Sequence, residues 1–105
     1  MYAGPDYSQQ NPGEAEYFGM DFVNQLQAGE EIIDGSQVVT ISVESGSDPY
    51  PDSRRMGLPI LTGSLVSQKI GGLLPDVYYI ILFKVSTSLG QTLILYSKLR
   101  CVEPS

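Results

Sequence analysis

The amino-acid sequence predicts an all-β domain, and three observations carry this prediction. Apolar and polar residues alternate with a period of two in several segments, β-branched residues are common in them, and turn residues separate them. The chain has 105 residues, of which 42% are hydrophobic, so it can bury one core. The regular spacing of short segments favours a sandwich of about seven strands or a small barrel.

The first 15 residues differ from the rest of the chain. They hold two Pro, two Gly and the isolated Tyr2 and Tyr7, with no apolar period. We therefore expect an extended N-terminal arm over residues 1–15 and a domain over 16–105. Two interpretations of the arm remain open: a disordered tail, or a segment that becomes ordered on a partner with both tyrosines as anchors.

The domain begins with an alternating segment. Phe18, Met20 and Phe22 alternate with other residues in a period of two, which favours a strand. A helix over residues 18–26 is the alternative, because Phe18, Phe22, Val23 and Leu26 also fit a helical period. The strand is preferred because the intervening Gly and Asp are poor helix formers.

Four more segments are predicted to be strands: residues 38–43, 65–70, 77–86 and 92–102. Segment 77–86 is apolar on both faces through its centre, so we expect a central strand. Residues 44–59 hold three Pro and two Gly, and we expect them to form a long loop without a strand interior.

The start of segment 77–86 carries a recognisable spacing. Leu73, Pro75 and Tyr79 fit the L-x-P-x-x-x-Y pattern seen before the penultimate strand of fibronectin type III-like sandwiches. Tyr79 is therefore a candidate tyrosine corner, in which the ring lies in the core and the hydroxyl bonds to upstream backbone.

Composition excludes several functions. There is no His and a single Cys, so imidazole chemistry, an internal disulfide and a cysteine zinc cage are excluded. The net charge of -6 argues against nucleic-acid binding. The sequence contains no run of 18 apolar residues, so it predicts no membrane span. No secretory signal is visible at the N-terminus.

Asp48 and Asp52 lie in a loop that lacks the residue order of a calcium-binding loop. Cys101 is expected to be a buried small hydrophobe. We expect no cofactor and no metal.

The few candidate reactive groups have plain interpretations. Adjacent Glu30 and Glu31 on a turn are expected to be a solvated surface, and Arg54-Arg55 a surface pair or a contact between subunits. An enzyme is not predicted, and the chain is better interpreted as a binding or structural module. An enzyme or a carbohydrate-binding module is a third class, since aromatic platforms suit sugars if Tyr2, Tyr7, Tyr17 and Tyr50 are exposed.

Charge is distributed unevenly along the chain. Residues 1–52 carry ten acidic groups and no basic ones, whereas residues 53–105 carry all six basic groups and two acidic ones. Lys98 and Arg100 share one face of the last predicted strand. We expect a negative and a positive patch that meet across copies of the chain, so that assembly weakens with salt.

The order of the motifs carries a resemblance. After Met20, residues 21–32 have the form D-[FW]-x-x-x-L-x-x-G-[DE]-x-I, followed by the segment VVTISV, Gly71-Gly72, Tyr79, the hairpin residues TSLGQ and a final L-x-C-V. Over about residues 16–102 this series resembles small immunoglobulin-like virion proteins of tailed bacteriophages, the fibre–tail adaptor family. Members often have Trp where Phe22 stands, and Gly where Asp76 or Val77 lies.

The resemblance implies an immunoglobulin-like sandwich that tethers tail fibres in the tail or neck of a virion. Its partners would be a tail or neck component, the tail-fibre N-terminus and neighbouring copies in a homo-oligomer. A capsid decoration or cement protein of the same fold is the alternative. The positions carried over are structural: Asp21, Phe22, Leu26, Gly29, Glu30, Gly72, Tyr79 and Gly90. Partner-binding candidates are Tyr2, Tyr7, Arg54, Arg55, Lys98 and Arg100.

Overall fold

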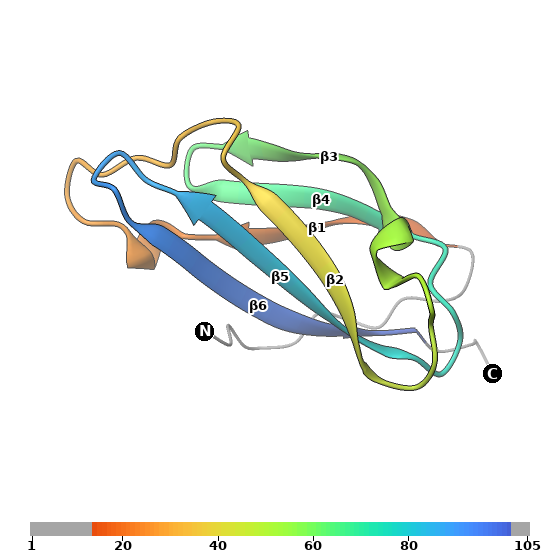
Figure 1. Cartoon of the computed structure of the whole chain (residues 1–105). Coiled ribbons are helices and arrows are strands. Elements are labelled where there is room, and N and C mark those ends of the chain that lie inside the picture. The colour runs from red at the N-terminus through yellow and green to blue at the C-terminus, as the bar shows by residue number, and fades with distance from the viewer. Residues whose placement is uncertain (1–13, 102–105) are drawn as a thin grey trace.

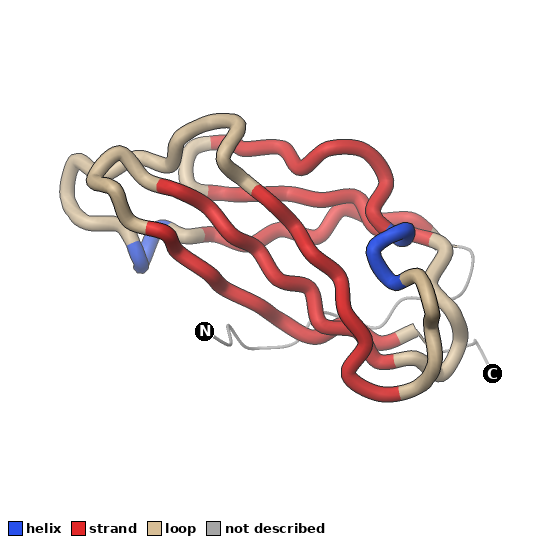
Figure 2. Tube along the Cα trace, viewed as in Figure 1, coloured by secondary structure: helices blue, strands red, loops and turns tan. Residues whose placement is uncertain are grey.

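Two antiparallel sheets make up the fold in the computed structural model, which describes residues 14–101. One sheet has the order β1-β4-β3 and the other β2-β5-β6, and the two lie face to face (Figures 1 and 2). The strands are β1 (Ala15–Asp21), β2 (Val38–Ser45), β3 (Arg55–Thr62), β4 (Leu65–Gly71), β5 (Tyr78–Ser86) and β6 (Thr92–Arg100). The all-β prediction is confirmed, with six strands rather than about seven within the described residues.

Most predicted strands are present with small changes at their ends. Residues 38–43 form β2, which continues to Ser45, and residues 65–70 form β4, which continues to Gly71. The segment with two apolar faces is β5, and its place between β2 and β6 confirms the central position. The expected arm lies almost wholly outside the described residues, as do Tyr2 and Tyr7. The strand that follows it begins at Ala15.

The start of the domain forms a strand, as predicted, and not the alternative helix over residues 18–26. β1 ends at Asp21, and only the short 3-10 turn η1 (Val23–Gln25) follows. The Asp21 carboxylate accepts the Val23 N–H at 2.9 Å, and the Phe22 N–H donates to the Ser64 carbonyl at 2.9 Å. These bonds end the strand and turn Phe22 into the core.

The prediction of a loop over residues 44–59 is wrong at both ends, and only residues 46–54 lack a strand. β2 extends into this segment, the 3-10 turn η2 (Pro51–Arg54) follows, and β3 begins at Arg55. β3 is an edge strand, where a Pro need not donate to a ladder, and Gly57 with φ of 80° forms an irregularity in its pairing with β4. The Asp52 carboxylate accepts the Ile41 N–H at 2.8 Å, so η2 covers part of the edge of β2.

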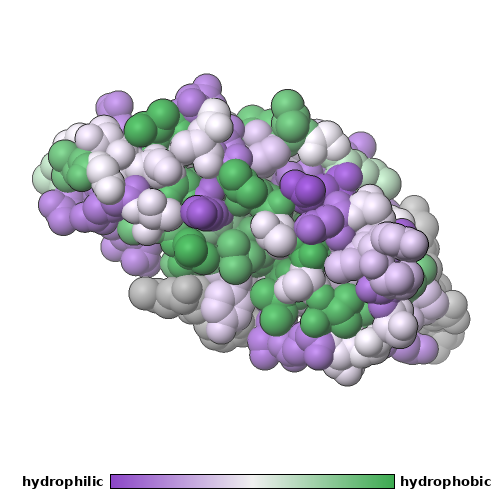
Figure 3. Space-filling view, viewed as in Figure 1, coloured by the Kyte–Doolittle hydropathy of each residue, from purple (hydrophilic) through white to green (hydrophobic). Residues whose placement is uncertain are grey.

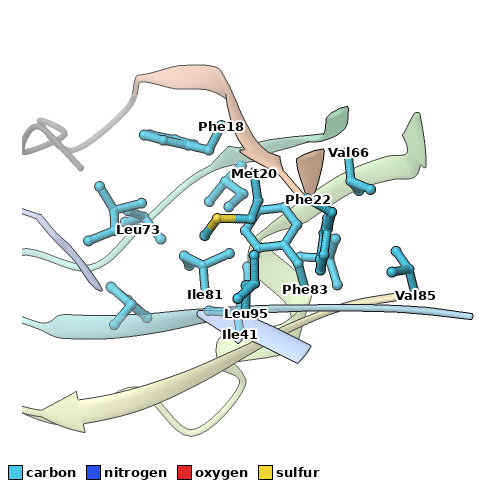
Figure 4. Close-up of a cluster of buried hydrophobic side chains, with 14 of the residues drawn as sticks. Phe18, Met20, Phe22, Ile41, Val66, Leu73, Ile81, Phe83, Val85 and Leu95 are labelled. Atoms are coloured by element: carbon cyan, nitrogen blue, oxygen red, sulfur yellow. The ribbon is translucent and has the colours of Figure 1, made fainter. Parts of the chain in front are cut away.

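The core lies between the sheets and is built by their inward-facing residues. β1 contributes Phe18 and Met20, followed by Phe22, and β5 contributes Ile81 and Phe83 opposite them (Figure 4). Both sheets supply fully buried side chains, so neither can retain its packing without the other. This single core holds the outer faces of the two sheets in fixed positions.

Candidate functional site

The outer face of the β2-β5-β6 sheet gathers apolar side chains at its centre. Because β5 alternates, its even-numbered residues point away from the core, and the pairing aligns them with residues of both neighbours. Four rows cross the sheet: Val38–Lys84–Ile94, Thr40–Leu82–Tyr96, Ser42–Ile80–Lys98 and Ser45–Tyr78–Arg100. Figure 3 shows apolar residues gathered over these strands, with polar residues around them.

The apolar residues of this face are open to solvent to different degrees. Val38 is 48% exposed and Tyr78 42% exposed, whereas Ile80 and Leu82 are half-buried at the centre. A central strand that is apolar on both faces normally has both faces covered. An exposed apolar sheet face is therefore a candidate contact surface for another protein.

Cations frame this apolar centre. Lys84 and Arg100 are exposed, and neither makes an ion pair with a residue in the described part of the chain. Lys98 lies 3.0 Å from the Glu44 carboxylate. The structure thus confirms that Lys98 and Arg100 share a face, and it adds Lys84 through the register of β5 and β6.

A buried polar network fixes the end of the sandwich where this face begins. Asp48, whose side chain is fully buried, accepts hydrogen bonds from Arg54 Nε at 3.0 Å and Nη2 at 3.1 Å. It also accepts the Tyr50 N–H at 3.0 Å and the Tyr79 hydroxyl at 2.8 Å. Asp48 therefore ties the β2–η2 connection to η2 and to the start of β5.

The Tyr79 hydroxyl makes the hydrogen bond to upstream backbone that the sequence predicts. It accepts the Leu74 N–H at 3.0 Å, and the ring is fully buried in the core. The upstream bond to Leu74 matches the geometry of a tyrosine corner. The bond to Asp48 was not predicted, because nothing in the local sequence places residue 48 beside residue 79.

The charges in this network change the pKa of two groups. The hydrogen bond from Arg54 is the main cause that lowers the pKa of Asp48 from 3.8 to about 2. Burial is the main cause that raises the pKa of Tyr79 from 10.0 to about 12. The network is therefore held as a carboxylate, a guanidinium and a neutral phenol through the neutral pH range.

The dibasic pair is placed differently from the sequence prediction. The Arg54 side chain is only 20% exposed and bonds to Asp48, so it has a structural role inside the chain. Arg55 lies 3.7 Å from the Asp52 carboxylate and is exposed. Arg54-Arg55 is thus not a plain surface pair, because the long segment folds back and places two aspartates beside it.

Acidic and basic residues pair within one molecule: two ion pairs lie close to the boundary at residue 52, and Glu44–Lys98 joins distant segments. All three ion pairs within residues 14–101 join an acidic residue of the first half to a basic residue of the second: Asp48–Arg54, Asp52–Arg55 and Glu44–Lys98. The expected separation into a negative and a positive patch therefore does not apply to these residues. A contact between copies would depend on charges outside the three pairs.

The expectation of a solvated Glu30-Glu31 surface is wrong for Glu30. Glu30 is 6% exposed, and its carboxylate accepts the Gln27 N–H at 2.9 Å and the Thr87 hydroxyl. Its burial needs these partners, because an unpaired buried carboxylate is costly. Glu31 is exposed as predicted.

The remaining structural positions lie in turns or in the core. Gly29, Gly72 and Gly90 have φ of 80°, 68° and 79°, which favours glycine at each turn. Phe22 is fully buried, Leu26 packs against the core, and Cys101 is buried as expected. Tyr17 and Tyr50 are 62% and 72% exposed.

Within residues 14–101, no group of three or more potential ligands among His, Cys, Asp and Glu could hold a metal ion. No helix in this part of the chain is long and apolar enough to cross a membrane. Comparison with known proteins found no matching family model, no matching curated protein and no matching solved structure.

Proposed function

We propose that this chain is a structural protein of a tailed-bacteriophage virion, a fibre–tail adaptor that holds a tail fibre to the tail or neck by protein–protein contacts. The observation that carries the proposal is the outer face of the β2-β5-β6 sheet, where an apolar centre is framed by Lys84 and Arg100. Such a face fits a partner surface that combines apolar and carboxylate side chains. The motif order that resembles adaptor proteins supports the tail or neck as its location.

The strand order supports an immunoglobulin-like fold within this proposal. In the constant-type immunoglobulin sandwich, strands A, B, E and D form one sheet and strands C, F and G form the other. The sheets β1-β4-β3 and β2-β5-β6 match the orders B-E-D and C-F-G. Tyr79 lies at the start of the strand that corresponds to F, where a tyrosine corner is expected.

The location is tested on purified phage particles. An antibody against this chain, bound to particles and viewed by electron microscopy, is expected to label the junction between tail and fibre. Mass spectrometry of the same particles is expected to detect the chain. Label over the head would favour the capsid decoration function, and absence of the chain from particles would overturn any virion role.

The contact face is tested by charge reversal in particles whose only copy of the chain is the variant. Lys84→Gln is expected to lower the amount of fibre retained on particles, and Lys84→Glu to lower it further, because the partner surface is acidic. Leu89→Glu adds a negative charge in the β5–β6 turn, where Leu89 is 55% exposed, and serves as the control. Equal fibre retention for Lys84→Glu and wild type would overturn the assignment of this face.

A further inference from the structure

The edge strand β3 contains an unusual irregularity opposite Gln68. Met56 pairs with Lys69 and Ile60 with Ser67, so residues 57–59 of β3 face the single residue Gln68 of β4. We call residues 57–59 the β3 bulge. Gly57 has φ of 80°, and Pro59 restricts the backbone at the other end. The bulge is therefore defined by residues that favour its conformation, as functional bulges usually are.

A buried side chain holds the bulge from inside the sandwich. Gln68 is fully buried, and its amide nitrogen lies 3.1 Å from the Gly57 carbonyl and 3.4 Å from the Met56 carbonyl. The same nitrogen lies 3.0 Å from the Lys69 carbonyl, while Gln68 Oε1 has no hydrogen-bond partner within residues 14–101. The amide nitrogen of Gln68 thus contacts backbone carbonyls of both strands and holds the bulge against β4.

The bulge presents one apolar side chain to solvent. Leu58 is 87% exposed, the largest exposed fraction among the exposed large hydrophobic residues, and Met56 and Ile60 beside it are 43% and 50% exposed. An apolar side chain on a backbone that is already fixed loses little entropy when it is buried by a partner. Leu58 has the properties of an anchor residue.

A cavity that fits such an anchor lies at the end of the β3–β4 hairpin. It has a volume of about 330 Å³ and is lined by Leu26, Glu30, Glu31, Ile32, Gly63 and Ser64. Leu26 and Ile32 supply apolar wall, and the exposed Glu31 supplies negative charge. The Glu30 carboxylate is already bonded to Thr87 and Gln27, so it does not need a ligand. We call this space the hairpin cavity.

The charges beside the two features are complementary. Lys69 faces Met56 across the sheet at the base of the bulge, whereas Glu31 borders the hairpin cavity. Asp21 adds negative charge near the cavity through its bond to Ser64 at 2.6 Å. We propose that Leu58 of one copy of this chain enters the hairpin cavity of a second copy, with Lys69 near Glu31 across the contact. This inference does not depend on the virion role.

The test measures self-association of the full chain by sedimentation velocity over a range of concentrations. Wild type is expected to associate. Leu58→Asp and Ser64→Phe, which remove the anchor and fill the cavity, are each expected to raise the concentration for half-association about tenfold or more. A mixture of the two variants is expected to associate better than either alone, because it restores one intact anchor and one intact cavity.

The control variant is Ile94→Asp, which places the same substitution at an exposed apolar residue on the outer face of the β2-β5-β6 sheet, and it is expected to associate as wild type does. Circular dichroism and the urea midpoint establish that each variant is folded. A wild-type chain that stays monomeric overturns the proposal, as does equal loss of association in Leu58→Asp and Ile94→Asp. Failure of the mixture to recover association also overturns it.

Discussion

At the scale of single residues, Asp48 and Tyr79 determine how one end of the sandwich is closed. Asp48 receives hydrogen bonds from Arg54, Tyr50 and Tyr79, and Tyr79 also receives one from Leu74. Every polar atom of this group that lies away from water has a partner, which is the condition for burying it without large cost. Removing one member therefore leaves another buried group unpaired.

Stability is expected to depend on pH through Asp48. Its pKa is lowered from 3.8 to about 2 by Arg54, so the folded state favours the carboxylate. The resulting stabilisation is present above about pH 4 and is lost as the pH falls toward about 2, by about 2 kcal/mol in total. Urea unfolding at several pH values measures this loss. In Asp48→Asn the free energy of unfolding is expected to fall less steeply as the pH is lowered, because residue 48 no longer titrates. An unchanged pH dependence would contradict this role of Asp48.

The tyrosine corner is tested by removing one oxygen. Tyr79→Phe is expected to lower the free energy of unfolding by about 1–3 kcal/mol, because the Leu74 N–H and the Asp48 carboxylate lose a partner. Tyr78→Phe is the matched control on the outer face, where a change of at most about 0.5 kcal/mol is expected. Equal effects in the two variants would show that the corner contributes nothing specific.

Asp76 occupies a position where the backbone favours glycine. Its φ is 62°, and it is the non-glycine residue with positive φ among residues 14–101. Asp76→Gly is expected to raise the free energy of unfolding by about 0.5–1 kcal/mol, and Asp76→Ala to lower it. Urea unfolding of wild type, Asp76→Gly and Asp76→Ala measures these free energies. A less stable Asp76→Gly or a more stable Asp76→Ala would contradict the prediction.

At the scale of elements, hydrogen bonds attach the long segment between β1 and β2 to the β5–β6 hairpin. The segment between β1 and β2 contacts the β5–β6 turn through the Glu30–Thr87 bond and the pairing of Ile32 with Thr87. The Ser88 N–H also donates to the Glu31 carbonyl at 2.8 Å. This connection has little regular structure of its own, so these bonds determine its position and the shape of the hairpin cavity.

Thr87→Val tests this attachment with almost no change in shape. The Glu30 carboxylate then loses its hydroxyl partner while it stays buried, and we expect a loss of about 1–3 kcal/mol. Hydrogen exchange of the Ser88 and Ile33 amides, both bonded across this attachment, is expected to become faster. Thr92→Val, at an exposed position of β6, is the control. Unchanged exchange in Thr87→Val would contradict the role of this bond.

At the scale of the whole molecule, both sheets depend on one core, and the ion pair Glu44–Lys98 joins β2 to β6. Phe83 in β5 is fully buried and lies in the same cluster as Phe18 and Phe22 from the opposite side. A core shared in this way is expected to unfold as one unit.

Phe83→Ala is expected to cost about 3–5 kcal/mol, which is a large part of the stability of a small domain. In wild type, tyrosine fluorescence and far-ultraviolet circular dichroism are expected to give the same urea midpoint. The outward-facing Ile94→Ala, at 41% exposure, is the control and is expected to cost much less. Two separate transitions in wild type would contradict the shared core.

Alternation along the chain was sufficient to predict five of the strands and the central place of β5, and the spacing of Leu73, Pro75 and Tyr79 was sufficient to predict the corner at Tyr79. These features follow from a local period of two and a short spacing, because side chains of a strand alternate between faces whatever their partners are. β3 was missed because Pro and Gly indicate a loop unless the strand lies at an edge, and edge position is a property of the sheet.

The tertiary structure alone decided which distant residues meet. Asp48 lies beside Tyr79, Glu30 beside Thr87 and Glu44 beside Lys98 because the chain passes between two sheets, and no local pattern encodes those pairs. The same pairing aligned Lys84 with the apolar centre of the outer face and placed Gln68 under the β3 bulge. The sequence by itself determined five of the six strands, because alternation is local, whereas long-range packing determined the edge strand β3, the burial of charges and the makeup of the surfaces.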